Sequence, residues 1–156
     1  MRAPNRTDSY HSLNIKYYML MDFLENDRTT SAADDVAIRN LIGLAALLGD
    51  EGSPEEYRRV YAPDAIWHMG PTTQSGADEI VAGAAARRAE GISGPGTGTR
   101  HLVVTLHVDV AGDSARAVSY YVFLAGTEIR TVGTYRDDLT RTGAGWQIRR
   151  REIAAG

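Results

Sequence analysis

The sequence predicts an α+β fold, in which a curved antiparallel sheet wraps around helices and leaves a pocket. In the first half of the chain, apolar residues recur at the three- and four-residue spacing of helices. From about residue 101 onward they alternate with polar residues, and glycine-containing turns separate the alternating segments. Helices followed by a run of hairpin-connected strands are typical of an α+β domain.

The chain of 156 residues is long enough for one domain with a substantial core and too short for two. Residues 1–30 have polar ends around an apolar centre, Ile15 to Leu24. We expect them to form an N-terminal extension that is either a tail or a docking element. The folded domain is expected to span residues 31–156.

The first helix is predicted to begin at Ser31 and to stop at Gly49 and Gly52. Ser31 and Asp34 have the spacing of a capping box, in which each side chain satisfies a free backbone amide of the first turn. The apolar positions of this helix are Ile38, Leu41, Ile42, Ala45 and Leu48.

A second, short helix is predicted from Ser53 to Tyr61, because a proline and two glutamates follow the serine as they do at many helix starts. Pro63 is expected to end it. Residues 65–69 then alternate as a strand, with Trp67 on one face and His68 on the other.

A third helix is predicted from Ala77 to Ala89, with Ser75 as its cap, and a glycine-rich loop over residues 92–99 leads to the strands. Tight turns near Gly112 and Gly145 favour antiparallel hairpins. Four strands are therefore predicted, over residues 102–110, 115–124, 129–139 and 146–153.

The composition excludes several classes of site and partner. The chain has no cysteine, which excludes disulfides, iron–sulfur clusters, thiolate zinc sites and a cysteine nucleophile. With a formal net charge of −3, the whole-protein field gives no reason to expect nucleic acid. The apolar run from Tyr17 to Leu24 is too short to cross a bilayer, so we expect a cytoplasmic protein with no membrane partner.

Asp50 and His101 are the candidate catalytic residues. Asp50 extends the apolar face of the first helix by one turn, and His101 opens the first strand of the meander. A carboxylate that holds one imidazole nitrogen leaves the other as a base near neutral pH. Each residue also has a purely structural interpretation, Asp50 as a polar helix end and His101 as a satisfied strand histidine.

The other polar candidates are weaker. His68 is predicted to have a surface or second-layer role, and His107 lies too far along its strand to share a site with His101. No spacing of two histidines with a carboxylate suggests a metal. Of Arg149-Arg150-Arg151, one arginine is expected to reach the pocket, because alternate strand residues face opposite sides. Residues 94–98 are interpreted as a lid or connector, since they lack the ending of a phosphate-binding loop.

Aromatic and other large residues are expected to line the pocket. Trp67 and Met69 share a face of the early strand, and Tyr121 and Phe123 share a face of a later one. Tyr135 lies on a third strand, beside small neighbours. Such a lining would hold an apolar, ring-sized ligand with a few polar handles. The alternative is that these side chains simply fill the core.

Several short segments also follow one another in a characteristic order and spacing. They are Ala37-Ile38-Arg39-Asn40-Leu41, Gly49-Asp50-Glu51-Gly52, Tyr61-Ala62-Pro63-Asp64-Ala65-Ile66-Trp67, Gly76-Ala77-Asp78-Glu79-Ile80, Thr99-Arg100-His101, Gly133-Thr134-Tyr135-Arg136 and Gly145-Trp146-Gln147-Ile148. With them the chain resembles the SnoaL-like branch of the nuclear-transport-factor-2-like superfamily over residues 33–154. The resemblance implies a cone-shaped α+β barrel with an apolar cavity, and a homodimer or larger homo-oligomer.

Members of this superfamily include scytalone dehydratase, hexachlorocyclohexane dehydrochlorinase, ketosteroid isomerase and polyketide cyclases. In the two eliminating enzymes a histidine–aspartate dyad abstracts a proton, and the resemblance assigns those positions to His101 and Asp50. The late-strand arginine of the family corresponds to Arg151. The carboxylate base of the isomerase and the second histidine of scytalone dehydratase have no clear counterpart in this chain.

The residues and the resemblance together predict an acid–base enzyme of the dehydratase, isomerase or cyclase type, with no metal or other cofactor. Its substrate is expected to be a small, mostly apolar, ring-containing metabolite, with Tyr121 or Tyr135 binding a substrate oxygen. One alternative is a ligand-binding or accessory module, such as a β-type subunit of an oxygenase. Another is a structural oligomer whose cavity is filled.

Overall fold

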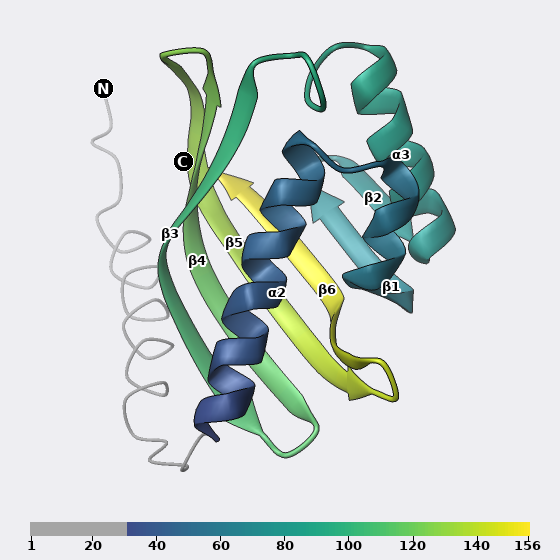
Figure 1. Cartoon of the computed structure of the whole chain (residues 1–156), viewed down its shortest axis with the longest axis vertical. Coiled ribbons are helices and arrows are strands. Elements are labelled where there is room, and N and C mark those ends of the chain that lie inside the picture. The colour runs from purple at the N-terminus through teal and green to yellow at the C-terminus, as the bar shows by residue number, and fades with distance from the viewer. Residues whose placement is uncertain (1–30) are drawn as a thin grey trace, which may run out of the picture.

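A six-stranded sheet forms the body of the molecule, and one long helix lies across one of its faces (Figure 1). The computed structural model describes residues 31–156, so the predicted extension over residues 1–30 lies outside the described residues. The sheet has the order β2-β1-β6-β5-β4-β3. Neighbouring strands are antiparallel except for β1 and β6, which are parallel. The predicted α+β class is therefore confirmed.

The elements have the following bounds. The helices are α2 (Ala32–Asp50), the 3₁₀ helix η1 (Pro54–Arg59) and α3 (Ala77–Ala89). The strands are β1 (Tyr61–Met69), β2 (Thr72–Ser75), β3 (Thr99–Ala111), β4 (Ser114–Ala125), β5 (Glu128–Thr142) and β6 (Gly145–Ala155). The four strands predicted after residue 101 are confirmed, each slightly longer than its apolar alternation indicated.

Helix α2 forms where it was predicted, but the expected capping box at its start is wrong. Ser31 is the N-cap and makes no side-chain capping hydrogen bond. Asp34 instead accepts a hydrogen bond from Trp146 Nε1 at 3.0 Å and pairs with Arg141 at 2.8 Å. These tertiary partners hold the start of the helix against the β5–β6 hairpin, so the carboxylate is not available to the first turn.

The segment after α2 is shorter and tighter than predicted. A capping box does form there, between Ser53 and Glu56, but the 3₁₀ helix ends at Arg59 rather than continuing to Tyr61. Strand β1 begins at Tyr61, earlier than predicted, because it pairs with β6: the backbone N–H of Ile148 donates to the Val60 carbonyl at 2.8 Å.

The short strand β2 was not predicted. It pairs with β1, with Trp67 opposite Gln74, and so it occupies the residues before α3. The prediction that Ser75 caps α3 is consequently wrong. Gly76 is the N-cap, at a positive φ of 85°, and the backbone N–H of Ser75 donates to Glu79 at 2.7 Å.

Helix α2 is fixed to the sheet at a bulge in β3. Thr105 has a φ of +50°, and the register between β3 and β4 shifts at this point. The bulge leaves the Leu106 carbonyl free for Arg39 of α2, whose Nη1 donates to it at 2.9 Å. The position of α2 across the sheet therefore depends on contacts at both of its ends.

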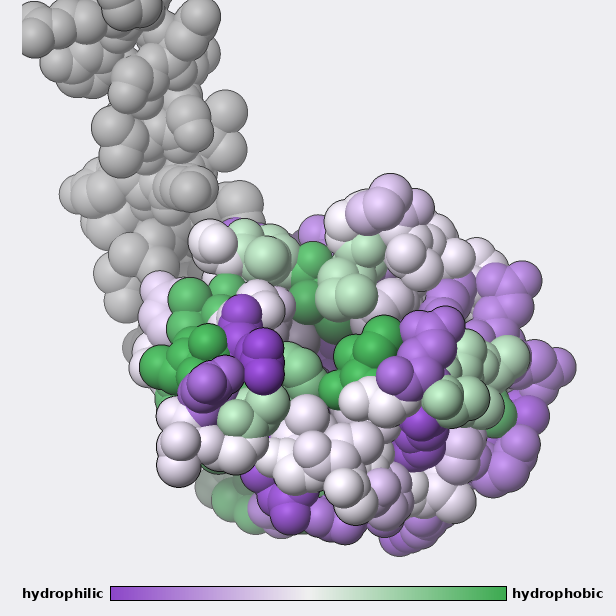
Figure 2. All heavy atoms as spheres, turned by 90° about the horizontal axis from the view of Figure 1, so that it is seen from above, coloured by the Kyte–Doolittle hydropathy of each residue, from purple (hydrophilic) through white to green (hydrophobic). Residues whose placement is uncertain are grey.

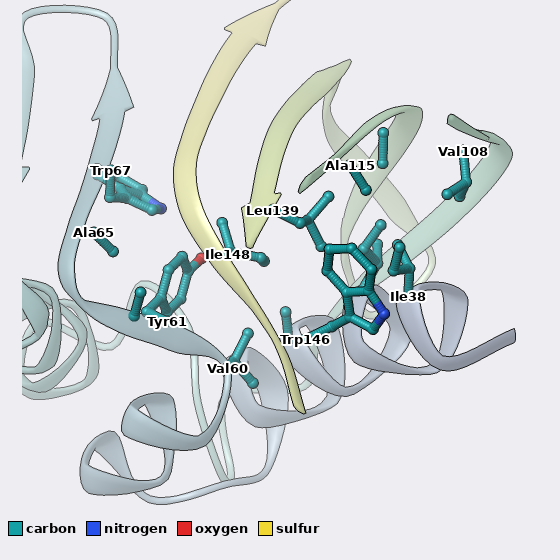
Figure 3. Packing of buried hydrophobic residues seen from close by; sticks show 14 of the residues in the cluster. Ile38, Val60, Tyr61, Ala65, Trp67, Val108, Ala115, Leu139, Trp146 and Ile148 are labelled. Carbon is teal, nitrogen blue, oxygen red and sulfur yellow. The ribbon is translucent and has the colours of Figure 1, made fainter. Parts of the chain in front are cut away.

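The core lies between α2 and the sheet (Figure 3). Ile38 and Ile42 of α2 are completely buried, as predicted from the helical spacing of apolar residues. Tyr61, Ala65 and Trp67 of β1 project to the same side of that strand and are buried too (Figure 3). Asp50 is the last residue of α2, at the end of the helix that follows Ile38 and Ile42.

Candidate functional site

A cavity of about 350 Å³ lies between the C-terminal end of α2, helix α3 and the sheet. Seen from above, hydrophobic and hydrophilic surfaces surround a hollow at this end of the molecule (Figure 2). The residues that line the cavity are Ala45, Ala46, Gly49, Tyr57, Tyr61, Trp67, Met69, Arg87, Ile92, Ser93, His101, Tyr121, Phe123, Thr131, Tyr135, Arg151, Ile153 and Ala155. The volume suits a ring-sized ligand and does not fit the interpretation of a filled structural core.

Asp50 and His101 are in direct contact, although 50 residues separate them in the chain. The Nδ1–H of His101 donates to Asp50 Oδ1 at 2.7 Å, and the backbone N–H of His101 donates to Oδ2 at 2.8 Å. Because a carboxylate can only accept, the proton of the neutral ring is placed on Nδ1, and Nε2 is left as the basic nitrogen. His101 lines the cavity and its side chain is 22% exposed, so a ligand can reach it.

Asp50 is held in place by the helix that it ends. It is the last residue of α2 and is only 3% exposed. Both of its carboxylate oxygens are used by His101, which makes the contact specific rather than a chance surface pairing. Asp50 is therefore positioned to orient the imidazole through one fixed hydrogen bond.

Gly49 provides the space in which the dyad meets Tyr57. A Cβ atom at position 49 would lie 3.3 Å from the Tyr57 hydroxyl and 3.5 Å from His101 Nδ1. The hydroxyl of Tyr57 and the imidazole therefore both border the space beside Gly49. Burial raises the pKa of Tyr57, and the nearby Arg87 opposes this shift only in part. The hydroxyl consequently stays protonated and can donate a hydrogen bond.

A buried ion pair forms another part of the cavity wall. Arg151, which is 5% exposed, donates from Nε and Nη2 to the two carboxylate oxygens of Asp137, at 2.7 Å each. Burial alone would lower the pKa of Arg151, but the Asp137 carboxylate outweighs it and raises that pKa above its ordinary value. The guanidinium also lies 4.5 Å from the centre of the Tyr135 ring. Arg151 is therefore the arginine of the 149–151 run that reaches the pocket.

Aromatic rings make up much of the remaining wall. Tyr121 and Tyr135 stack with their centres 4.4 Å apart, and Phe123 lies opposite His101 across β3 and β4 with ring centres 4.5 Å apart. Gly133 makes room for this arrangement, because a Cβ there would lie 2.6 Å from the Tyr121 ring. Every residue that the sequence indicated for substrate binding lines the cavity: Trp67, Met69, Tyr121, Phe123, Tyr135 and Arg151. Their role in binding stays a prediction.

The other two histidines of residues 31–156 do not line this cavity. His68 lies on the outer side of β1 and contacts Thr73 Oγ1 at 2.8 Å, and His107 is also absent from the lining. His11 falls outside the described residues. The loop before β3 contributes Ile92 and Ser93 to the lining, as a connector between α3 and the dyad strand.

Four residues of the site were missed by sequence reasoning: Tyr57, Tyr61, Arg87 and Asp137. Tyr57 and Tyr61 were assigned to the predicted second helix without a role. Arg87 lies on the predicted third helix and was given no role. Asp137 lies two residues after Tyr135 on the same strand, so both side chains face the same side of the sheet. This spacing could have indicated Asp137 from the sequence.

Residues 31–156 contain neither a cluster of metal-ligating side chains nor a membrane-spanning helix. No three histidine, cysteine, aspartate or glutamate side chains come together there in a way that could hold a metal ion. No helix in this part of the chain is long and apolar enough to cross a membrane.

The model of one protein family matches most of this chain. It describes a SnoaL-like domain and covers residues 30–152, which include every element of the fold except the last three residues of β6, and the whole cavity lining except Ile153 and Ala155. The chain belongs to the SnoaL-like domain family. No curated protein matches this SnoaL-like chain.

Solved structures share the fold of this SnoaL-like protein at low sequence identity. A protein of unknown function with a cystatin-like fold from Nostoc punctiforme has a TM-score of 0.74 and 18% identity, and the match covers 83% of this chain and 96% of that one. A putative scytalone dehydratase from Novosphingobium aromaticivorans has a TM-score of 0.64 and 20% identity, covering 80% and 85%. The protein LinA has a TM-score of 0.68 and 16% identity, covering 80% and 86%.

Proposed function

We propose that this SnoaL-like protein is a cofactor-independent acid–base enzyme of the dehydratase, isomerase or cyclase type. The observation that carries the proposal is the Asp50–His101 pair in the wall of a ring-sized cavity. The similarity in fold to a putative scytalone dehydratase is consistent with it. The proposed substrate is a small ring compound with an acidic C–H bond beside an electron-withdrawing group.

In the proposed reaction, His101 Nε2 removes the proton from the activated carbon. The electrons of the broken C–H bond then form a new double bond. In an elimination, this bond joins the neighbouring carbon, and the leaving group departs with its bonding pair. In an isomerisation, the electrons move towards the neighbouring carbonyl group and form an enolate. Asp50 keeps the ring in one orientation and offsets the charge of the imidazolium, without itself taking the proton. The imidazolium then returns the proton to the leaving group or to another carbon.

The hydroxyl of Tyr57 is suited to a second role. Because burial raises its pKa, it stays neutral and can donate a hydrogen bond to a substrate oxygen as negative charge develops there. Tyr121 and Tyr135, whose pKa values burial also raises, line the same cavity and offer the same kind of donor. The cavity therefore contains a base and several neutral donors.

Hydrogen–deuterium exchange at carbon tests this proposal without knowledge of the natural substrate. Small cyclic ketones and their β-hydroxy derivatives are incubated with the protein in D₂O, and loss of the C–H signal and any elimination product are followed by NMR. We expect His101→Gln to slow the reaction by about 10²–10⁴-fold, since a positioned base contributes that much. Asp50→Asn should also slow it, while His68→Gln, a histidine outside the cavity, should not.

Exchange that continues undiminished in His101→Gln would overturn the assignment of the base. If the wild-type protein binds ring compounds in the cavity but exchanges none of them, the function is that of a ligand-binding or accessory module. Circular dichroism and urea unfolding of each variant show whether a loss of exchange reflects a loss of fold.

A further inference from the structure

Arg87 differs from the other arginines around the cavity. It lies in the last turn of α3, lines the cavity and is partly buried. Its guanidinium carbon lies 4.8 Å from the centre of the Trp67 ring. Arg151, in contrast, is bound to Asp137, and Arg88 donates from Nη2 to the Leu48 and Gly52 carbonyls.

The backbone carbonyl of Arg87 accepts a hydrogen bond from Ile92 at 2.9 Å, but its guanidinium makes no hydrogen bond or ion pair with any residue of the described part of the chain. The lining of the cavity contains two arginines and no aspartate or glutamate. The charge of Arg151 is offset by Asp137 behind it, and Asp50 lies behind His101. Within residues 31–156, Arg87 is therefore the cavity cation whose charge is not paired with a carboxylate.

The charge of Arg87 also reaches the dyad side of the cavity. Among the charges that act on the Tyr57 hydroxyl, Arg87 gives the largest effect that lowers its pKa. Tyr57, Arg87 and His101 all line the same cavity of about 350 Å³. An anionic group held by Arg87 would consequently belong to a molecule within reach of the dyad.

A guanidinium that rests on an aromatic face is oriented, and its N–H groups remain for another partner. Such a fork matches the two oxygens of a carboxylate, which it can bind through two parallel, charge-assisted hydrogen bonds. The Trp67 ring provides the flat support and is itself buried, at 6% exposure. The remaining lining is mostly aromatic and aliphatic, as a ring would require, with Ser93, His101, Thr131 and Arg151 as its polar members.

We propose that Arg87 determines the specificity of the cavity by binding a carboxylate on a small ring-containing substrate. This inference rests on the proposed function only for what happens to the bound molecule. The binding of a carboxylate by Arg87 does not depend on the proposed function. It changes the expected substrate class, from a mostly apolar ring to a ring acid. The acidic C–H bond would lie between the carboxylate and His101.

Calorimetry with pairs of ligands that differ only in charge tests the proposal. Benzoate, cyclohexanecarboxylate and 2-naphthoate are each compared with the neutral carboxamide of the same shape. We expect the wild-type protein to bind at least one acid about 10-fold or more tightly than its amide, because a charge-assisted pair replaces a neutral one. Arg87→Gln should remove this preference, and Arg87→Lys should keep only part of it.

Two further variants make the result specific. Arg116→Gln removes an exposed arginine that pairs loosely with Asp138, at 3.9 Å, outside this cavity, and it should keep the full preference for the acid. His101→Gln should also keep it, since the base is not the anion site. The outcome that overturns the proposal is an equal affinity for acid and amide in the wild-type protein, or a preference that persists in Arg87→Gln.

A ring acid that also carries an exchangeable C–H bond, 3-oxocyclohexanecarboxylate compared with its carboxamide, separates this inference from the proposed function. Binding that depends on Arg87 but leads to no exchange at carbon upholds the anion site and rejects the proton abstraction. Exchange that depends on His101 and does not distinguish acid from amide rejects the anion site alone. Urea unfolding of Arg87→Gln checks that the loss of the contact with Trp67 leaves the protein folded.

Discussion

His101 is restrained on several sides, and each restraint comes from a different element. Asp50 of α2 holds both its ring and its backbone, and Phe123 of β4 lies against the ring. Gly49, one residue before Asp50, presents no side chain to the imidazole. A base that is held in one orientation loses little entropy when it reacts, which is the structural argument for a functional dyad over a merely satisfied strand histidine.

At the residue scale, the buried tyrosines predict how stability depends on pH. Burial raises the pKa of Tyr61 to about 12, against the opposing influence of the neighbouring Arg151. An unfolded tyrosine ionises near pH 10. The folded state thus keeps its proton where the unfolded state loses it. The free energy of unfolding should therefore fall as the pH rises from about 10 to about 12, by roughly 1 kcal/mol per pH unit for this group.

Urea unfolding at a series of alkaline pH values, followed by tryptophan fluorescence, measures this slope. Tyr61→Phe should make it shallower, while Tyr135, whose pKa burial also raises, keeps part of it. An equal slope in Tyr61→Phe and wild type would show that Tyr61 does not cause the decline.

At the scale of elements, the Arg151–Asp137 pair joins β5 to β6 behind the cavity. The two residues are direct cross-strand neighbours, and both side chains are almost completely buried. Removing one partner of such a pair leaves an uncompensated charge in the interior, whereas replacing both by apolar residues does not. The pair should therefore behave as a unit in stability measurements.

We expect Arg151→Met to lower the free energy of unfolding by about 3–5 kcal/mol, and the double variant Arg151→Met with Asp137→Leu to recover much of that loss. As a control, Arg130→Gln breaks an exposed pair with Glu128 and should cost less than about 1 kcal/mol. Urea unfolding measures all three. If Arg151→Met is as stable as Arg130→Gln, the interior tolerates the unpaired carboxylate of Asp137.

At the scale of the whole molecule, the outer face of the sheet is apolar where β3, β4 and β5 adjoin. We call this the outer-face patch, and it consists of Leu102, Val104, Tyr120 and Val132, each about half exposed. Leu102 and Val132 both pair with Val122, and Val104 lies opposite Tyr120, so the side chains form adjacent rows. Monomeric proteins seldom leave such a contiguous apolar surface open to water.

We propose that a second copy of the chain covers the outer-face patch in a homodimer. Two rows of apolar side chains can pack against the same rows of a copy related by a two-fold axis, because such an interface is self-complementary. Light scattering after size exclusion should give a dimer mass for the wild-type protein. Tyr120→Glu should shift it towards the monomer, and Leu47→Glu, a change at an exposed apolar residue of α2 away from the patch, should not.

A monomer mass for the wild-type protein at micromolar concentration would exclude this homodimer. A dimer that persists in Tyr120→Glu would mean that the copies meet elsewhere.

The spacing of apolar residues in the sequence was sufficient to predict which segments are helices or strands, and which face of each one is buried. Ile38 and Ile42 indicated the buried side of α2, and the alternation of Trp67 and His68 indicated the inner side of β1. Errors occurred at the ends of elements. Ser31 and Ser75 have the residue type of caps, but Asp34 bonds to Trp146 and β2 pairs with β1, so tertiary contacts override the local signals.

The sequence by itself thus determined the α+β class, the strands of the meander and the residues able to act as base and partner. Only the tertiary structure decided that Asp50 meets His101, that Arg151 meets Asp137, and that Arg87 of α3 reaches the cavity. The physical reason is that periodicity specifies which way a side chain faces within its own element. The relation between two distant elements depends on how the helices pack across the sheet, through contacts such as that of Arg39 with the bulge in β3.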